Sequence, residues 1–170
     1  VGEGNLASGL EGKGRMMEPH QIAENIISYF NPSLPLKNKK VLITAGPTYE
    51  AIDPVRFIGN HSSGKMGFSL AREAAELGAK VTLITGPTAQ IISHPNVLIV
   101  NVVSTLEMFD AVKEYYLNTD IAIAAAAVAD YKPETQVLQK IKKKADFLTL
   151  NLVPTQDILC LLYTSDAADE

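Results

Sequence analysis

The stretch "KKVLITAGPTYE", residues 39–50, decides the predicted fold, because two lysines lead into a short apolar run that a turn then ends. A run such as residues 41–45, bounded by turn signals, is typical of a strand buried on both faces of a parallel sheet. Similar runs recur along the chain. We expect the other strands in "KVTLIT" at 80–85, "NVLIVNVV" at 96–103, "DIAIAAAAVADY" at 120–131 and "FLTLNLV" at 147–153.

Helical patterns lie between these strands. Residues 66–78 carry an apolar face, and Gly78 ends this predicted helix. A second helix is predicted at residues 105–117, because Ser104 before it and Glu107 within it have the spacing of a capping box. Strands that alternate with helices of about a dozen residues predict a parallel sheet with helices on both faces. The fold class is therefore α/β, with a Rossmann-like doubly wound, mostly parallel sheet.

The N-terminal part of the chain has a different pattern. Residues 1–20 are rich in glycine and lack periodicity. Residues 19–30 then place four apolar side chains on one predicted helical face, and "NPSLP" at 31–35 ends that helix as a linker. The apolar residues are Ile22, Ile26, Ile27 and Phe30.

Composition restricts the possible functions. The 170 residues are 46% hydrophobic and carry a net charge of −4, which argues against a general binder of nucleic acids or anionic membranes. The longest apolar run, residues 121–129, is too short to span a bilayer, and the N-terminus has no secretory signal. Cys160 is the single cysteine, so no internal disulfide is expected and a cytoplasmic location is predicted.

The sequence "GNHSSGKMG" at 59–67 matches the beginning of a phosphate-binding P-loop. Met66 stands where a P-loop has the magnesium-binding Ser or Thr, and the preceding "EAIDPVRFI" does not look like a central strand. A P-loop triphosphatase is therefore disfavoured, although residues 62–64 at a helix start could still bind an anion. A dinucleotide-binding domain is disfavoured too, because no G-x-G-x-x-G follows residues 41–45.

Several turn sequences are expected to meet at one edge of the sheet, because ligands of such sheets bind beyond the carboxyl ends of the strands. These are "GPT" at 46–48, a second "GPT" at 86–88 and "ADY" at 129–131. We interpret the first "GPT" as functional and the second as a simple turn. The lysines of "KIKKK" at 140–144 are either a solvated patch or a clamp for a triphosphate.

Three motifs resemble a known family. The segments "VLITAGPTYEAIDPVRFIGNHSSGKMG" (41–67), "AAAVADYKP" (125–133) and "KIKK" (140–143) are similar to the phosphopantothenate–cysteine ligase (phosphopantothenoylcysteine synthetase) domain of the bifunctional bacterial coenzyme A biosynthesis protein. The resemblance covers residues 36–159.

The resemblance also implies a domain organisation. Residues 1–20 look like the tail of the phosphopantothenoylcysteine decarboxylase domain, with Ser8 where that family usually has cysteine, and residues 21–35 form a helix and linker. Residues 160–170 do not follow the family, so the ligase domain and its sheet are predicted to be truncated at the C-terminus. We therefore expect little or no turnover from residues 1–170 alone.

The resemblance further implies a reaction. The carboxylate of phosphopantothenate attacks the α-phosphate of CTP, and the amine of cysteine then displaces CMP from the acyl-cytidylate. Lys140, Asn60 and Arg56 correspond to catalytic residues of the family. The implied substrate loop is His61, Ser62, Ser63, Gly64 and Lys65, and the implied nucleotide site is Gly46, Ala124, Ala125, Ala126, Asp130, Lys140, Asp157, Ile158 and Leu159.

The implied cofactors and partners follow from this reaction. Magnesium would accompany CTP, with metal ligands unknown, and FMN would belong only to the decarboxylase domain, which is largely absent here. The family implies a homodimer of ligase domains and a larger assembly of the full fusion. Two alternatives stay open: a non-catalytic nucleotide-binding fragment and a P-loop-type nucleotide phosphohydrolase.

Overall fold

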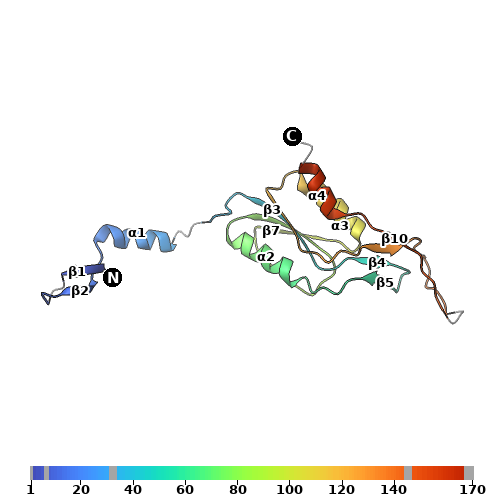
Figure 1. The fold of residues 1–170 in the computed structure, drawn as a ribbon, viewed down its shortest axis with the longest axis horizontal. Coiled ribbons are helices and arrows are strands. Elements are labelled where there is room, and N and C mark those ends of the chain that lie inside the picture. The colour runs from blue at the N-terminus through green and yellow to red at the C-terminus, as the bar shows by residue number, and fades with distance from the viewer. Residues whose placement is uncertain (1, 6–7, 31–33, 144–146, 167–170) are drawn as a thin grey trace. The chain divides into compact units, whose positions relative to one another are not determined.

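The structure, a computed structural model, describes residues 2–5, 8–30, 34–143 and 147–166. The chain forms two compact units, which divide between Leu34 and Pro35 (Figure 1).

The first unit contains an antiparallel hairpin and one helix. The hairpin was not predicted, because it depends on glycines at unusual backbone angles, such as Gly4 at φ 155° and Gly14 at φ 134°, and not on apolar alternation. The predicted helix at 19–30 is confirmed, but none of its residues is buried. The elements are β1 (Gly2–Asn5), β2 (Glu11–Arg15) and α1 (Pro19–Phe30).

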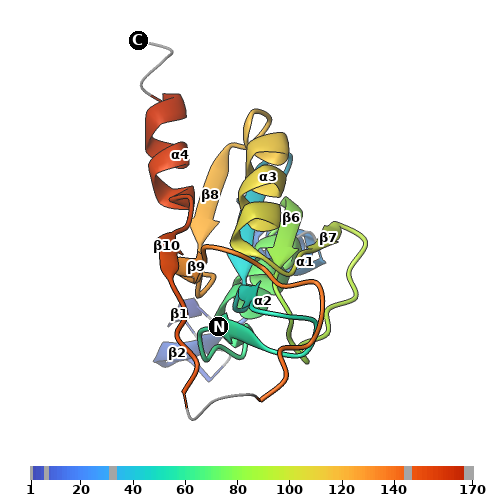
Figure 2. The same cartoon turned by 90° about the vertical axis from the view of Figure 1, so that its right-hand side faces the viewer.

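The second unit is built on a four-stranded sheet in the order β7-β6-β3-β8, and every pairing in it is parallel (Figures 1 and 2). Ile43 in the central strand lies beside Leu83 on one side and Ile123 on the other. The predicted α/β class with a parallel sheet is confirmed. The strands are β3 (Lys40–Ala45), β6 (Lys80–Thr85), β7 (Val97–Asn101) and β8 (Ile121–Ala124).

Helices cover both faces of this sheet, as the doubly wound fold requires (Figure 1). Val41 and Ile43 pack against α2 (Lys65–Glu76), whereas Leu42 packs into a second cluster with α3 (Thr105–Tyr116). The predicted capping box is present, since the Ser104 hydroxyl accepts a hydrogen bond from the Glu107 N–H at 3.2 Å.

The predicted fifth strand at 147–153 is wrong as a member of this sheet. Only its end forms a strand, β10 (Leu152–Pro154), which pairs antiparallel with β9 (Tyr131–Pro133) in a separate two-stranded sheet. The physical reason is the lack of a buried face, since Phe147 is 80% exposed and Leu148 53%. Alternation between apolar and polar residues misled the sequence prediction.

A second hairpin lies in the connection that the sequence left without regular structure. Strands β4 (Tyr49–Ala51) and β5 (Phe57–Gly59) pair antiparallel, and the rings of Tyr49 and Phe57 stack at 4.0 Å between centroids. Because β5 lies outside the parallel sheet, the sequence 59–67 does not follow a central strand. This geometry agrees with the rejection of a P-loop.

The segment after Asp157 is also more regular than expected. The sequence analysis predicted no regular structure for residues 160–170, but α4 (Ile158–Asp166) is a helix beside α3 (Figure 2). Ile158 is buried, and the Tyr116 hydroxyl donates to the Leu162 carbonyl at 3.0 Å. Among the described residues, no helix is long and apolar enough to cross a membrane.

The turns after β3 and β6 touch so closely that residue 86 must be glycine. A Cβ atom on Gly86 would lie 1.6 Å from the Pro47 carbonyl oxygen. We predict that Gly86→Ala lowers the free energy of unfolding by about 2 kcal/mol or more, because the clash is with backbone. Urea denaturation followed by circular dichroism measures this. Exposed Glu76→Ala on α2 serves as the control, and an equally small effect of both changes would contradict the prediction.

Candidate functional site

A pocket of about 510 Å³ opens at the carboxyl ends of β3 and β8. The predicted turn at 129–131 contributes to it, whereas the turns at 46–48 and 86–88 are not among its lining residues. Its lining includes Thr44, Ala124, Ala126, Val128, Asp130, Tyr131, Pro154, Thr155, Gln156, Asp157, Ile158 and Leu159.

Six of the residues predicted for the nucleotide site line this pocket: Ala124, Ala126, Asp130, Asp157, Ile158 and Leu159. The structure brings them together from two segments that lie some thirty residues apart. The small alanine side chains leave the backbone of this wall open to a ligand.

The alanine wall is fixed by the end of β3. The Ala125 N–H donates to the Thr44 carbonyl at 3.2 Å, and the Ala126 N–H donates to the Thr44 hydroxyl at 3.3 Å. The carbonyl of Gly46, at φ 71°, accepts a hydrogen bond from the Ala127 N–H at 2.8 Å. Gly46 thus shapes the predicted site through its backbone conformation.

One carboxylate at the pocket has a structural partner. Oδ1 of Asp157 accepts hydrogen bonds from the N–H groups of Leu159 at 2.8 Å and Cys160 at 3.0 Å. Asp157 therefore caps the N-terminus of α4, which is the ordinary role of such a residue at that position. Asp130 is exposed at the pocket.

A buried polar network lies directly behind the pocket. The Thr48 hydroxyl contacts the Thr105 hydroxyl at 2.9 Å and accepts a hydrogen bond from the Ala129 N–H at 2.8 Å. The Ala129 carbonyl accepts from the hydroxyls of Thr105 at 3.3 Å and Thr155 at 2.7 Å. The buried Glu50 carboxylate accepts from the Thr105 N–H at 2.7 Å, at the start of α3. The network fixes the backbone immediately before Asp130.

Asn60 is attached to the rim of the same pocket. Its Nδ2 donates to the carbonyl of Val128 at 2.7 Å, and Val128 lines the pocket. The structure therefore brings Asn60 close to the predicted nucleotide site, although the two are more than sixty residues apart.

The predicted substrate loop, residues 61–65, leads into α2. Gly64 is the N-cap at φ 71° and, as a glycine, makes no side-chain cap hydrogen bond. The Ser62 hydroxyl accepts from the Gly64 N–H at 3.3 Å, and the Ser63 hydroxyl from the Lys65 N–H at 3.4 Å. His61, Ser63 and Lys65 are exposed, and Gly64 is packed close to Gly46.

The second "GPT" does more than form a turn. The Thr88 hydroxyl donates to the Ser63 carbonyl at 2.7 Å and holds the substrate loop in place. Our sequence interpretation of this segment as a simple turn was therefore incomplete. The sequence did contain a signal for this role, since "GPT" occurs at both 46–48 and 86–88.

Arg56 pairs with a carboxylate of its own chain. Both Nε and Nη2 of Arg56 donate to Oδ2 of Asp53, whose side chain is completely buried. The guanidinium, helped by the N–H groups of Val55, Ile141 and Arg56, holds the pKa of Asp53 well below its usual range, although burial acts to raise it. The sequence analysis assigned a role to Arg56 but none to Asp53, which it treated only as part of a segment unsuited to a central strand.

Lys140 lies next to Ile141, which contacts this ion pair. Lys140, Lys142 and Lys143 are exposed, and Lys144 lies outside the described residues.

Within the described residues, no group of three or more His, Cys, Asp or Glu side chains is placed to hold a metal ion.

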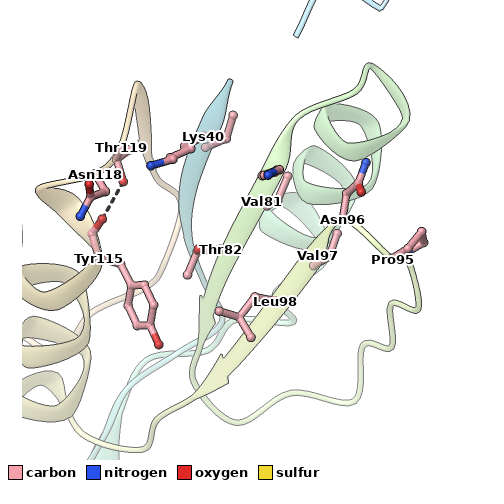
Figure 3. A pocket seen from close by; sticks show the side chains of 12 residues that line it. Lys40, Val81, Thr82, Pro95, Asn96, Val97, Leu98, Tyr115, Asn118 and Thr119 are labelled. Carbon is pink, nitrogen blue, oxygen red and sulfur yellow. Dashed lines mark hydrogen bonds between the residues drawn. The ribbon is translucent and has the colours of Figure 1, made fainter. Parts of the chain in front are cut away.

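Another pocket, of about 490 Å³, lies at the opposite edge of the sheet, where β3, β6 and β7 begin (Figure 3). Lys40, Thr82, Leu98, Tyr115 and Asn118 are among its lining residues. None of the predicted site residues is among them. The pocket at the carboxyl ends is the candidate site, as the fold class predicts.

Comparison with known proteins agrees with this fold. Residues 36–169 match the family described as the DNA/pantothenate metabolism flavoprotein C-terminal domain, or DFP. The chain belongs to the DFP family.

Curated relatives match over 92% of the chain. Identity is 50% over 158 residues with the coenzyme A biosynthesis bifunctional protein CoaBC of Vibrio vulnificus (strain YJ016), and 46% over 159 residues with that of Escherichia coli (strain K12). It is 49% over 161 residues with a protein named cysteine/cysteine sulfinic acid decarboxylase from an unknown prokaryotic organism. The chain spans 39% of the length of the first two and 45% of the third.

Solved structures show the same DFP fold. The crystal structure of the C-terminal domain of CoaBC has 45% identity and a TM-score of 0.65, with 76% of this chain and 60% of that chain covered. The DNA/pantothenate metabolism flavoprotein from Streptococcus pneumoniae has 27% identity and a TM-score of 0.68, with 76% and 66% covered.

We predict that Thr48→Val destabilises the DFP domain by about 1–3 kcal/mol, because the buried Ala129 N–H loses its acceptor while the side-chain volume is kept. Urea denaturation measures the loss. Thr135→Val, at an exposed position, is the matched control. Equal stability of Thr48→Val and the wild type would show that the network does not hold the pocket wall.

Proposed function

We propose that this chain carries the CTP-dependent phosphopantothenate–cysteine ligase activity of a bifunctional coenzyme A biosynthesis protein. The observation that supports it most is the pocket at the carboxyl ends of β3 and β8, which gathers most of the expected nucleotide-site residues. Asn60, expected to act on the intermediate, is attached to the same pocket through Val128. The names of the 46–50% identical relatives support the same pathway.

The proposed reaction has two steps. A carboxylate oxygen of phosphopantothenate attacks the α-phosphorus of CTP, and the bond to pyrophosphate breaks. The cysteine amine then attacks the acyl carbon of the acyl-cytidylate, loses a proton, and expels CMP to leave an amide. Charge accumulates on phosphate in the first step, and in this proposal the Lys140 ammonium group is the cation that stabilises its transition state.

Asn60 suits the second step. An amide group has two N–H donors and one acceptor, and one Asn60 N–H is used by the Val128 carbonyl. The other can donate to the acyl carbonyl without competing as a nucleophile. The side chain is thereby oriented before the intermediate forms.

Magnesium enters this proposal with the nucleotide. Mg²⁺ is usually held by one or two carboxylates together with substrate phosphates. Asp130 and Asp157 are both exposed carboxylates at the pocket, and since Asp157 caps α4, Asp130 is the one that we propose would hold the ion. Bound there, the ion would neutralise charge on the triphosphate. Cytoplasmic location, a homodimer of ligase domains, and FMN confined to a decarboxylase domain stay predictions.

A CMP-release assay with CTP, phosphopantothenate and cysteine tests the activity. The enzyme is a chimera in which residues 1–159 continue into the C-terminal part of the Escherichia coli relative, assayed beside residues 1–170. A ligase releases CMP and pyrophosphate only when phosphopantothenate is present. Release of a nucleoside diphosphate would indicate a phosphohydrolase, and CTP binding without turnover would indicate a non-catalytic module.

We predict that Lys140→Ala in this chimera slows pyrophosphate release about a hundredfold, because the transition state loses about 3 kcal/mol of charge stabilisation. Lys142→Ala, an exposed lysine two positions away, is the matched control and should keep most of the rate. If Lys142→Ala caused the larger loss, Lys140 would not be the catalytic lysine.

We predict that Asn60→Asp lets the acyl-cytidylate form but slows its conversion to the amide. The added negative charge disfavours attack at the acyl carbon, and the donor to its carbonyl is lost. Mass spectrometry of the quenched reaction should then show the trapped intermediate. Equal slowing of both steps, with nothing trapped, would contradict the role.

A further inference from the structure

We infer that Asp53 and Arg56 are positioning residues that fasten the lysine-bearing loop, and with it Lys140, to the body of the ligase. This inference rests on the proposed function only for the role of Lys140. The geometry itself is independent of it: one buried carboxylate and one guanidinium bind the backbone N–H and the backbone carbonyl of Ile141.

The two oxygens of Asp53 have different tasks. Oδ1 accepts the N–H groups of Val55 at 2.8 Å and Arg56 at 2.9 Å, which closes the local turn between β4 and β5. Hydrogen bonds from an Asp side chain to nearby backbone N–H groups are common in protein turns, so these two bonds alone indicate no function. Oδ2 is directed elsewhere. It accepts the Arg56 side chain and the Ile141 N–H at 3.1 Å, and Ile141 is 88 residues distant in sequence.

Arg56 completes the attachment. Its Nη2 donates to Oδ2 of Asp53 and also to the Ile141 carbonyl at 3.0 Å. Asp53 and Arg56 together thus satisfy the N–H and the C=O of Ile141, which fixes the direction of the backbone directly after Lys140. The Arg56 side chain is 41% exposed while Asp53 is 0% exposed, so the buried charge is compensated by a partner at the surface.

The loop between β9 and β10 needs such an attachment. Its described residues, 134–143 and 147–151, extend away from the sheet (Figure 1), and apolar burial contributes little to holding them, since Leu138 is 88% exposed. Lys140, Lys142 and Lys143 repel one another, and ordering each residue costs about 1–2 kcal/mol of conformational entropy. One further bond, from the Val137 N–H to the Ile52 carbonyl at 3.0 Å, ends at the same turn.

Lys140 is therefore held between two attachments to residues 52–56, at Val137 and at Ile141. In this arrangement the Arg56 guanidinium donates hydrogen bonds to Asp53 and to the Ile141 carbonyl. We accordingly assign Arg56 to positioning and not to contact with the substrate, a role that the sequence resemblance alone did not suggest.

Hydrogen exchange tests the attachment without any assay of activity. Asp53→Asn keeps an oxygen for the local turn but replaces Oδ2 by an NH₂ group, which cannot accept from Ile141. In residues 1–170, amide exchange in peptides covering 137–143 should accelerate about tenfold or more, while β3 and β6 stay protected. Arg56→Lys, which leaves both Asp53 oxygens in place, should accelerate the same peptides.

Two controls match these variants. Asp110→Asn and Arg72→Lys change exposed residues of α3 and α2, and neither should alter exchange in 137–143. Unchanged exchange in Arg56→Lys, or in a folded Asp53→Asn, would overturn the attachment. If the Asp53→Asn variant does not fold, hydrogen exchange of the Arg56→Lys variant alone tests the attachment.

A double-mutant cycle in the chimera tests the link to Lys140. Asp53→Asn should lower kcat about tenfold and change KM for CTP less than about threefold, because the lysine is misplaced and not removed. In a Lys140→Ala background, the same substitution should cost no more than about twofold, since its effect passes through Lys140. A full tenfold loss in that background would show that Asp53 acts elsewhere.

The two kinds of failure are distinguishable. If the chimera and its variants show no turnover while exchange still responds to Asp53→Asn, the attachment stands and the proposed function falls. If the chimera turns over and Asp53→Asn neither accelerates exchange nor lowers kcat, the proposed function stands and the positioning role falls.

Discussion

The turn after β3 is the constraint on which the candidate site depends, because both neighbouring strand ends are built against it. Residue 86 is restricted to glycine by contact with Pro47, and the Gly46 carbonyl accepts from the Ala127 N–H. Thr48 then extends the connection by accepting from the Ala129 N–H. Residues 46–48 thus continue the parallel pairing beyond the regular strands, and one pocket wall is formed from backbone that cannot move independently.

Two buried carboxylates attach the additional hairpin to this frame. Glu50 accepts an N–H at the start of α3, where the helix dipole favours negative charge, and Asp53 is neutralised by Arg56. A buried charge without a partner would be costly, so each acid specifies one arrangement of the elements it joins. The hairpin β4–β5 is therefore fixed at one end to the start of α3 and at the other to the loop that carries Lys140.

The sequence was sufficient for the regular part of the fold and insufficient for its polar attachments. Apolar runs and the capping box predicted β3, β6, β7 and α3, because burial and local hydrogen bonding act within a few residues. The same pattern failed at 147–153, where no partner face exists. Family motifs brought Asp130 and Asp157 to one pocket, but no local signal could reveal that Asp53 contacts Ile141, since this contact depends on how two distant loops fold back.

Charge explains why the lysine loop must be attached at all in the proposed reaction. The chain carries a net charge of −4, and Asp130 and Asp157 lie at the pocket, so an incoming triphosphate meets a site without excess positive charge. Lys140 can compensate only if it stays within a few ångströms, because surface charges are screened over about 8 Å at physiological salt. In the proposed reaction, the ion pair of Asp53 and Arg56 would therefore act by limiting the positions that the Lys140 ammonium group can reach.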